Sequence, residues 1–159
     1  MDVEHRASLS GDIEVRASGK VGGVAMLYGD AADLGRGVRE VFAPGALKPG
    51  DVPARITEGH GGPVVAPAPE IRFEHDRLEV EFSAEPEIRA RVQRGELRHF
   101  SIEFISRAER FLTDTFTREI REAILTGVAL VPNPAYRQTS AEARAEVSED
   151  ADNAILWLL

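Results

Sequence analysis

Two segments, HFSIEFISRAERFL (99–112) and TFTREIREAILTGVALV (115–131), decide the fold of this 159-residue chain. Both are rich in β-branched and aromatic residues, and TDT (113–115) between them is a turn sequence, so they predict two long strands. The first carries an unusual pattern, because Ser101, with His99 two places before it, interrupts an apolar run. The hydroxyl is either a cross-strand hydrogen-bonding partner or a nucleophile.

The rest of the chain predicts shorter strands and one helix. PEIRARVQRGEL (86–97) is typical of a helix, with Pro86 in its first turn and Gly95 at its end. The strand predictions fall in the following segments: 12–17, 21–29, 39–47, 52–60 and a hairpin over 70–84. The pattern indicates a mostly β (α+β) protein, a barrel or sandwich with helical insertions.

Three parts are expected along the chain. Residues 1–11 are polar and predict a flexible N-terminus, and residues 12–139 predict the folded domain. Residues 140–159 predict an acidic tail that ends in the apolar segment AILWLL. The apolar end is a docking segment, a self-processing segment or an element packed back on the domain.

Composition excludes several classes of function. The formal net charge is −8, whereas nucleic-acid binders carry a basic face, so no nucleic acid is expected as a partner. The chain has no cysteine, which excludes disulfides and thiolate chemistry. No apolar run approaches the ~18 residues of a membrane span, and the first residues lack a signal-peptide pattern, so we expect a soluble intracellular protein.

Short catalytic signatures are missing from the sequence. It contains no G-x-S-x-G, no H-E-x-x-H and no P-loop, and its four histidines lack the spacing of zinc ligands, so neither a metal nor a cofactor is expected. His60, in E-G-H-G-G-P, remains of interest because the flanking glycines permit a tight turn that exposes the ring. His60 is either a base for Ser101 or a polar loop residue.

The order of several segments resembles one protein family. VGGVAMLYGD, REVFAPGAL, a strand ending in His60, a helix leading into HFSIEF, and REAILTGVALVPNPAY follow one another over residues 21–139. Together they resemble the prohead (capsid maturation) proteases of tailed bacteriophages. In that family a helix leads into G-(L/M)-S-x-G-F, and the domain closes on E-V-S-L-V-x-x-P-A.

The resemblance implies the fold, the activity and two site residues. The family's serine falls on Ser101 and its histidine on His60. The fold would be the closed β-barrel of herpesvirus assemblin, surrounded by helices, and the activity that of a serine endopeptidase. The substrates would be a scaffolding protein, the major capsid protein and the protease itself. Analogy with the viral relatives would make the protein a homodimer, and the location would be the assembling procapsid in the cytoplasm of the bacterial host.

Three positions depart from the family pattern and leave the third catalytic residue open. Glu103 stands where the family has glycine after its serine, Gly127 stands for the acid of E-V-S-L-V, and Gly61 follows His60. We expect Glu122 to orient the imidazole, because its strand would pair beside Ser101. The competing interpretation of Glu122 is a solvated strand face.

The remaining site positions and the activity itself also leave choices open. Glu119 and Glu58 are rivals for the orienting acid, and His99 is another candidate for the orienting group. Arg137 or backbone amides would stabilise the oxyanion. The departures also permit a catalytically inactive capsid assembly factor, and a cellular β-barrel binding module is a third possibility.

Overall fold

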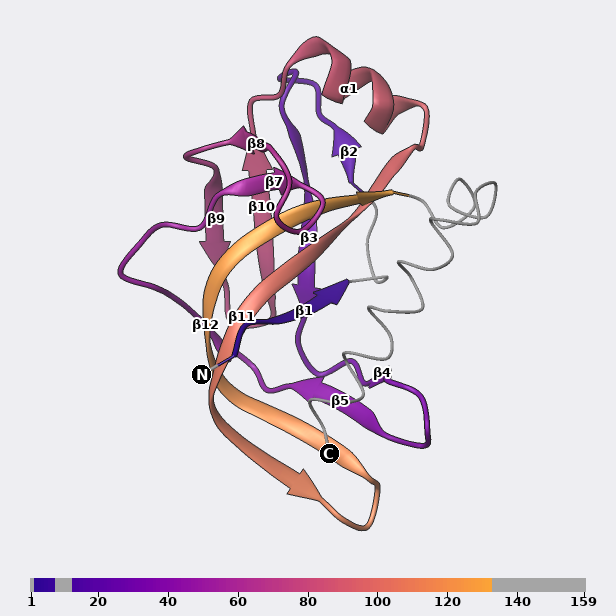
Figure 1. Ribbon diagram of the computed structural model, residues 1–159, viewed down its shortest axis with the longest axis vertical. Coiled ribbons are helices and arrows are strands. Elements are labelled where there is room, and N and C mark those ends of the chain that lie inside the picture. Colours follow the sequence, from indigo (N-terminus) through magenta and orange to yellow (C-terminus); the bar gives the residue numbers. More distant parts are fainter. Residues whose placement is uncertain (1, 8–12, 133–159) are drawn as a thin grey trace.

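A computed structural model describes residues 2–7 and 13–132 of the chain. In this part, strands predominate and a single helix interrupts them (Figure 1). The elements are β1 (Glu4–Ala7), β2 (Glu14–Val15), β3 (Val21–Leu27), β4 (Ala32–Asp33), β5 (Arg39–Phe42), β6 (Leu47–Pro49), β7 (Ile56–Glu58), β8 (Val64–Ala66), β9 (Glu70–Phe73), β10 (Arg77–Phe82), α1 (Pro86–Gln93), β11 (Leu97–Leu112) and β12 (Thr117–Pro132). The predicted hairpin over 70–84, the helix from Pro86 and the two long strands are therefore confirmed.

The antiparallel hairpin of β11 and β12 organises the larger sheet. Its two strands run together from Leu97 opposite Pro132 to Leu112 opposite Thr117. Along its other edge β12 pairs in parallel with β5, then β6, then β7, so three short strands line up end to end beside one long strand. On the outer edge of β11 lies β1. Figure 1 shows the hairpin as a long curved band across the molecule.

A smaller sheet, with strand order β2-β3-β10-β9, packs on the larger one. Leu78, Val80 and Phe82 alternate along β10, are at most 3% exposed, and join Phe100, Ile102 and Phe104 of β11 in one core cluster. Burying a side chain of this size stabilises the fold by about 1.5–3 kcal/mol. Helix α1 adds Ile88 and Val92 to the same core. One continuous core therefore holds the two sheets together.

The closed barrel implied by the family resemblance is not confirmed. Among residues 2–7 and 13–132, the strand pairing gives two separate sheets, and no ladder joins the edge of one to the other. The mostly β class is correct.

The expectation of a flexible N-terminus is wrong for residues 4–7, which form β1. Four buried charges hold this strand: Arg6 Nε donates to Glu40 Oε1 at 2.6 Å, and Arg118 donates to both carboxylate oxygens of Glu4 at 2.6 and 2.8 Å. Burial alone would lower the pKa of Arg118, but its hydrogen bonds to Glu4 and Glu109 raise that pKa above its ordinary value. The charges are therefore mutually satisfied, as burial requires. The predicted tail, residues 140–159, lies outside the described residues.

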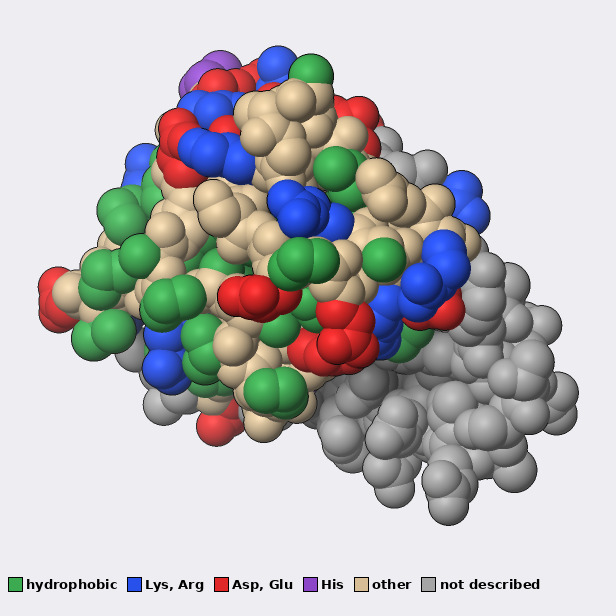
Figure 2. All heavy atoms as spheres, turned by 90° about the horizontal axis from the view of Figure 1, so that it is seen from above, with side chains coloured by type: hydrophobic (Ala, Val, Ile, Leu, Met, Phe, Trp, Pro, Cys, Tyr) green, Lys and Arg blue, Asp and Glu red, His purple; other side chains and the backbone are tan. Residues whose placement is uncertain are grey.

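The surface carries both signs of charge. On the face shown in Figure 2, acidic, basic and hydrophobic side chains lie among one another, with no extended patch of a single sign. In the part of the chain that the structure describes, no helix has the length and apolar character needed to cross a bilayer.

Candidate active site

The strand β11 separates a core face from a polar face. Phe100, Ile102 and Phe104 point into the core, whereas Ser101 and Glu103 alternate with them and point to the other side. Ser101 is 3% exposed. Its partners across the neighbouring strands are small, Ala7 on β1 and Ala129 on β12. The serine hydroxyl therefore has no bulky neighbour on either flanking strand.

A glycine turn after β7 presents His60 to this face. The amide of Gly62 donates to the carbonyl of Gly59, which closes a four-residue turn, and Gly61 at its third position has φ +74°. Such a turn requires glycine there, because a side chain at positive φ is strained. The amide of Gly59 also donates to the carbonyl of Leu130 on β12. The turn is thus tied to the residue after Ala129, the partner of Ser101.

The side chains of His60 and Ser101, which the sequence analysis predicted as a pair, are in contact. His60 Nε2 lies 2.7 Å from Ser101 Oγ, although the two residues are 41 positions apart in the sequence. This distance is inside the range of ~2.6–3.2 Å expected for a nucleophile and its base. Which of the two atoms donates depends on the tautomer of the imidazole.

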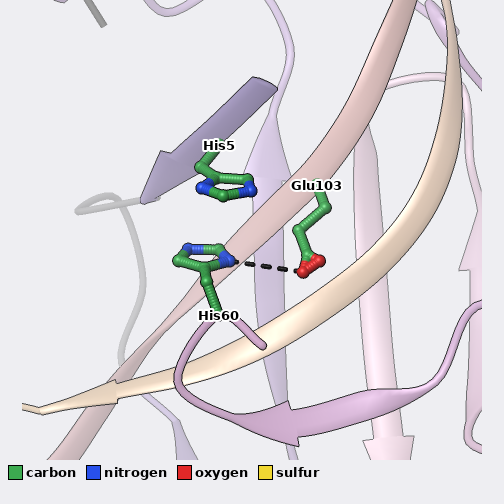
Figure 3. Close-up of side chains that lie close together, drawn as sticks. All are labelled: His5, His60 and Glu103. Carbon is green, nitrogen blue, oxygen red and sulfur yellow. Dashed lines mark ion pairs between the residues drawn. The ribbon is translucent and has the colours of Figure 1, made fainter. Parts of the chain in front are cut away.

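Glu103 lies behind the imidazole. Its Oε1 is 3.4 Å from His60 Nδ1, an ion-pair distance (Figure 3). Nδ1 is buried, and among the described residues it has no hydrogen-bond partner of good geometry. The imidazole beside it lowers the pKa of the Glu103 carboxyl below its ordinary value, against the opposing effect of burial. Ser101, His60 and Glu103 therefore form a chain of hydroxyl, imidazole and carboxylate.

Gly127 provides the space for the Glu103 carboxylate. The two residues are partners in the β11–β12 ladder, and a Cβ atom at position 127 would lie 2.9 Å from Glu103 Oε2. Two of the positions that depart from the expected pattern, Glu103 and Gly127, therefore face each other across the ladder.

His5 of β1 stacks on the outer side of His60. The ring centroids are 3.8 Å apart and the planes differ by 2°. His5 is the register partner of Glu103, so both side chains lie on the same face of the sheet (Figure 3). Sequence reasoning missed His5, because nothing in a spacing of 55 residues indicates contact with His60.

The structure does not bring Glu122 to the pair, so the expected placement is wrong. Glu122 is exposed and lies opposite Ala108, seven residues along β11 from Ser101, which corresponds to about 23 Å of strand. The prediction assumed that pairing between the strands would bring any β12 acid near the serine, but the register places Ala129 there.

The two rival acids have basic partners away from the imidazole. Glu58 pairs with Arg91 of α1, and Glu119 pairs with Arg110 at 3.4 Å. His99 lies on the same face as Ser101 and is buried, and its Nδ1 has no hydrogen-bond partner within residues 2–7 and 13–132. The position proposed for the oxyanion, Arg137, lies outside the described residues.

Comparison with known protein families gives a match for the second half of the chain. Residues 75–153 match the family model of the caudovirus prohead serine protease. The resemblance of the chain to this family is therefore confirmed. The matched segment includes Ser101 and Glu103 and begins after His60, which the fold brings to it. No match was found among curated proteins or among solved structures.

Proposed function

We propose that the protein is a serine endopeptidase with Ser101 as nucleophile, His60 as general base and Glu103 as the orienting acid. The observation that carries the proposal is the contact of 2.7 Å between His60 Nε2 and Ser101 Oγ, with a carboxylate at the other ring nitrogen. The match to the prohead serine protease family supports a peptidase, and the geometry supports these three residues as its machinery.

The reaction follows from the order of these groups. Glu103 favours the tautomer with its proton on Nδ1, which leaves Nε2 free to accept. As Ser101 Oγ attacks the scissile carbonyl, its proton passes to Nε2, and Glu103 stabilises the imidazolium. The imidazolium then protonates the leaving amine, which departs and leaves an acyl-enzyme ester. His60 takes a proton from water, the hydroxide releases the new carboxylate, and Ser101 regains its proton.

We infer the substrate from the family. A scaffolding protein, the major capsid protein and the protease itself are the proposed targets, inside the procapsid that assembles in the host cytoplasm. Confinement in a shell raises the effective concentration of the cleavage site, so weak recognition is sufficient. The interspersed charges on the face in Figure 2 fit protein partners better than nucleic acid. A homodimer is part of the same proposal.

The assemblin-like barrel also belongs to this proposal. The single core shared by the two sheets supports it, since the same elements would enclose that core in a barrel. A crystal structure with strand pairing between the edges of the two sheets would establish closure, and two sheets without such pairing would refute it.

Co-expression with the neighbouring capsid gene tests the activity. We expect shortened capsid subunits with the wild type and intact subunits with Ser101→Ala or His60→Ala, measured by mass spectrometry. A fluorophosphonate probe should label Ser101 in the wild type and leave Ser101→Ala unlabelled. If the wild type is not labelled and shells assemble normally on Ser101→Ala, the chain is an inactive assembly factor instead.

A further inference from the structure

Three potential metal ligands converge at the outer end of the candidate active site. His5, His60 and Glu103 each offer one nitrogen or oxygen atom, and these atoms all lie within 4.8 Å of one another (Figure 3). They come from three separate elements: β1, the turn after β7, and β11. For His60 the atom is Nδ1, since Nε2 contacts Ser101.

The donor set fits zinc. Two imidazole nitrogens and one carboxylate oxygen are a known zinc-binding combination, with bond lengths of about 2.0–2.2 Å and a fourth position left to water. A tetrahedral site with such bonds has its ligand atoms about 3.4 Å apart. His60 Nδ1 and Glu103 Oε1 already stand at 3.4 Å. Magnesium and calcium prefer an all-oxygen set, which this site does not offer.

The site closes by a small movement of His5. The ligand atoms lie within 4.8 Å of one another, so no pair has to approach by more than about 1.4 Å to reach the tetrahedral value. The parallel rings direct their in-plane lone pairs side by side, so His5 must also rotate out of the stack. His5 is exposed on the edge strand β1, so a rotation of its side chain into another rotamer can make this adjustment.

We propose that His5, His60 and Glu103 bind one zinc ion and that zinc reversibly inhibits the hydrolase. The inhibitory half rests on the proposed function, whereas the binding half stands on the geometry alone.

The chemistry of inhibition concerns the tautomer of His60. A zinc ion on Nδ1 takes the lone pair that this nitrogen exposes once its proton has left, and the neutral ring then carries its proton on Nε2. Nε2 can now only donate to Ser101 Oγ and cannot accept the proton of the attacking hydroxyl. Zinc also occupies the Glu103 carboxylate, which removes the group that stabilises the imidazolium. The nucleophile is left without a base.

Zinc titration of the full chain tests the binding half. After treatment with EDTA and its removal, zinc chloride is added to the wild type, His5→Ala and the control His75→Ala, and heat is measured by calorimetry. His75 is exposed and stands outside the ligand cluster. We expect one zinc per wild-type and His75→Ala chain, and an affinity at least ~10-fold weaker for His5→Ala. No binding by the wild type at ~100 μM zinc, or equal affinity in His5→Ala, overturns the site.

Fluorophosphonate labelling with and without zinc tests the inhibitory half. For each variant we compare the labelling rate with zinc to the rate without it. For the wild type and His75→Ala, zinc should lower this ratio at least ~10-fold, and the midpoint of this loss should coincide with the midpoint of the zinc-binding curve. For His5→Ala at the same zinc concentration, the ratio should stay near 1. Binding without a change in labelling, or labelling that requires zinc, overturns inhibition. A wild type that is never labelled refutes the proposed function, and calorimetry still decides the metal site.

Discussion

Replacing Glu103 with glutamine tests the assignment of the third catalytic residue. The change keeps the size of the side chain and removes its charge, so the effect reports on the attraction between the carboxylate and the His60 imidazolium. At the observed 3.4 Å, that attraction is about 5 kcal/mol for an effective dielectric constant of about 20, and about 2.4 kcal/mol if partial solvent exposure doubles the constant. The expected loss in rate is therefore between about 60-fold and about 4,000-fold.

The assay is the second-order rate of fluorophosphonate labelling in the presence of EDTA, which removes any zinc. Glu122→Gln is the matched control, because it removes the same charge from an exposed position remote from Ser101. We expect its labelling rate to stay within about twofold of the wild type. A rate for Glu103→Gln within about threefold of the wild type, or an equal loss in Glu122→Gln, would refute the assignment.

The surroundings of the site lead to three more predictions. Because Glu103 and Gly127 are register partners, the double variant Glu103→Gly/Gly127→Glu should react with the fluorophosphonate probe at least ~10-fold faster than Glu103→Gly alone. If the labelling rate does not recover, a carboxylate at position 127 cannot replace the one at position 103. Arg6→Ala leaves the buried Glu40 without its strongest partner and should lower the free energy of unfolding in urea by about 3–5 kcal/mol, whereas Arg72→Ala, which breaks exposed ion pairs, should cost under ~1 kcal/mol. A loss under ~1 kcal/mol for both variants would contradict the role given to the buried charges. Since the pKa of Glu103 is lowered in the folded state, its carboxylate stabilises the fold above its unfolded pKa of about 4.3, and this contribution is lost as the pH falls through the folded value. The stability difference between wild type and Glu103→Gln, measured by urea unfolding, should therefore shrink below about pH 4, and a constant difference down to pH 2 would be inconsistent with the shift.

The long hairpin could be predicted from sequence because its pattern is strong and local. Phe100 and Phe104 alternate with polar residues on β11, and the turn residues mark its end. The pair of His60 and Ser101 came from the family resemblance, since no local pattern joins residues 41 positions apart. The glycines around His60 indicated a turn, but they did not indicate which residue the His60 side chain would contact.

The third residue could have been found from the same periodicity. Ser101 and Glu103 are two positions apart on one strand, so they share a face, just as His99 and Ser101 do. The choice of Glu122 instead assumed a register between the two strands, and register is the property that sequence specifies least clearly here. Bulges between Glu103 and Phe104 and on either side of Ala108 displace the pairing further.

The strand β1 could not be predicted because its polar residues lie on its buried face. Glu4 and Arg6 point inward, but charged residues in a hydropathy pattern predict a solvent-exposed segment. Their partners, Glu40 and Arg118, lie on β5 and β12, far along the chain. Only the three-dimensional arrangement shows that these charges neutralise one another.

The position of Ser101 between two neighbouring strands determines how a polypeptide can reach it. Both edges of β11 at this point are already paired with neighbouring strands, β1 on one side and β12 on the other, and Ala7 and Ala129 are the register partners of Ser101. A substrate segment consequently has no vacant ladder beside the nucleophile and must approach from above the plane of the sheet. Ala7 is exposed beside this approach, whereas Ala129 is fully buried. A bulkier side chain at position 7 would then narrow the approach from its β1 flank, so this position is the place to engineer which peptides are admitted.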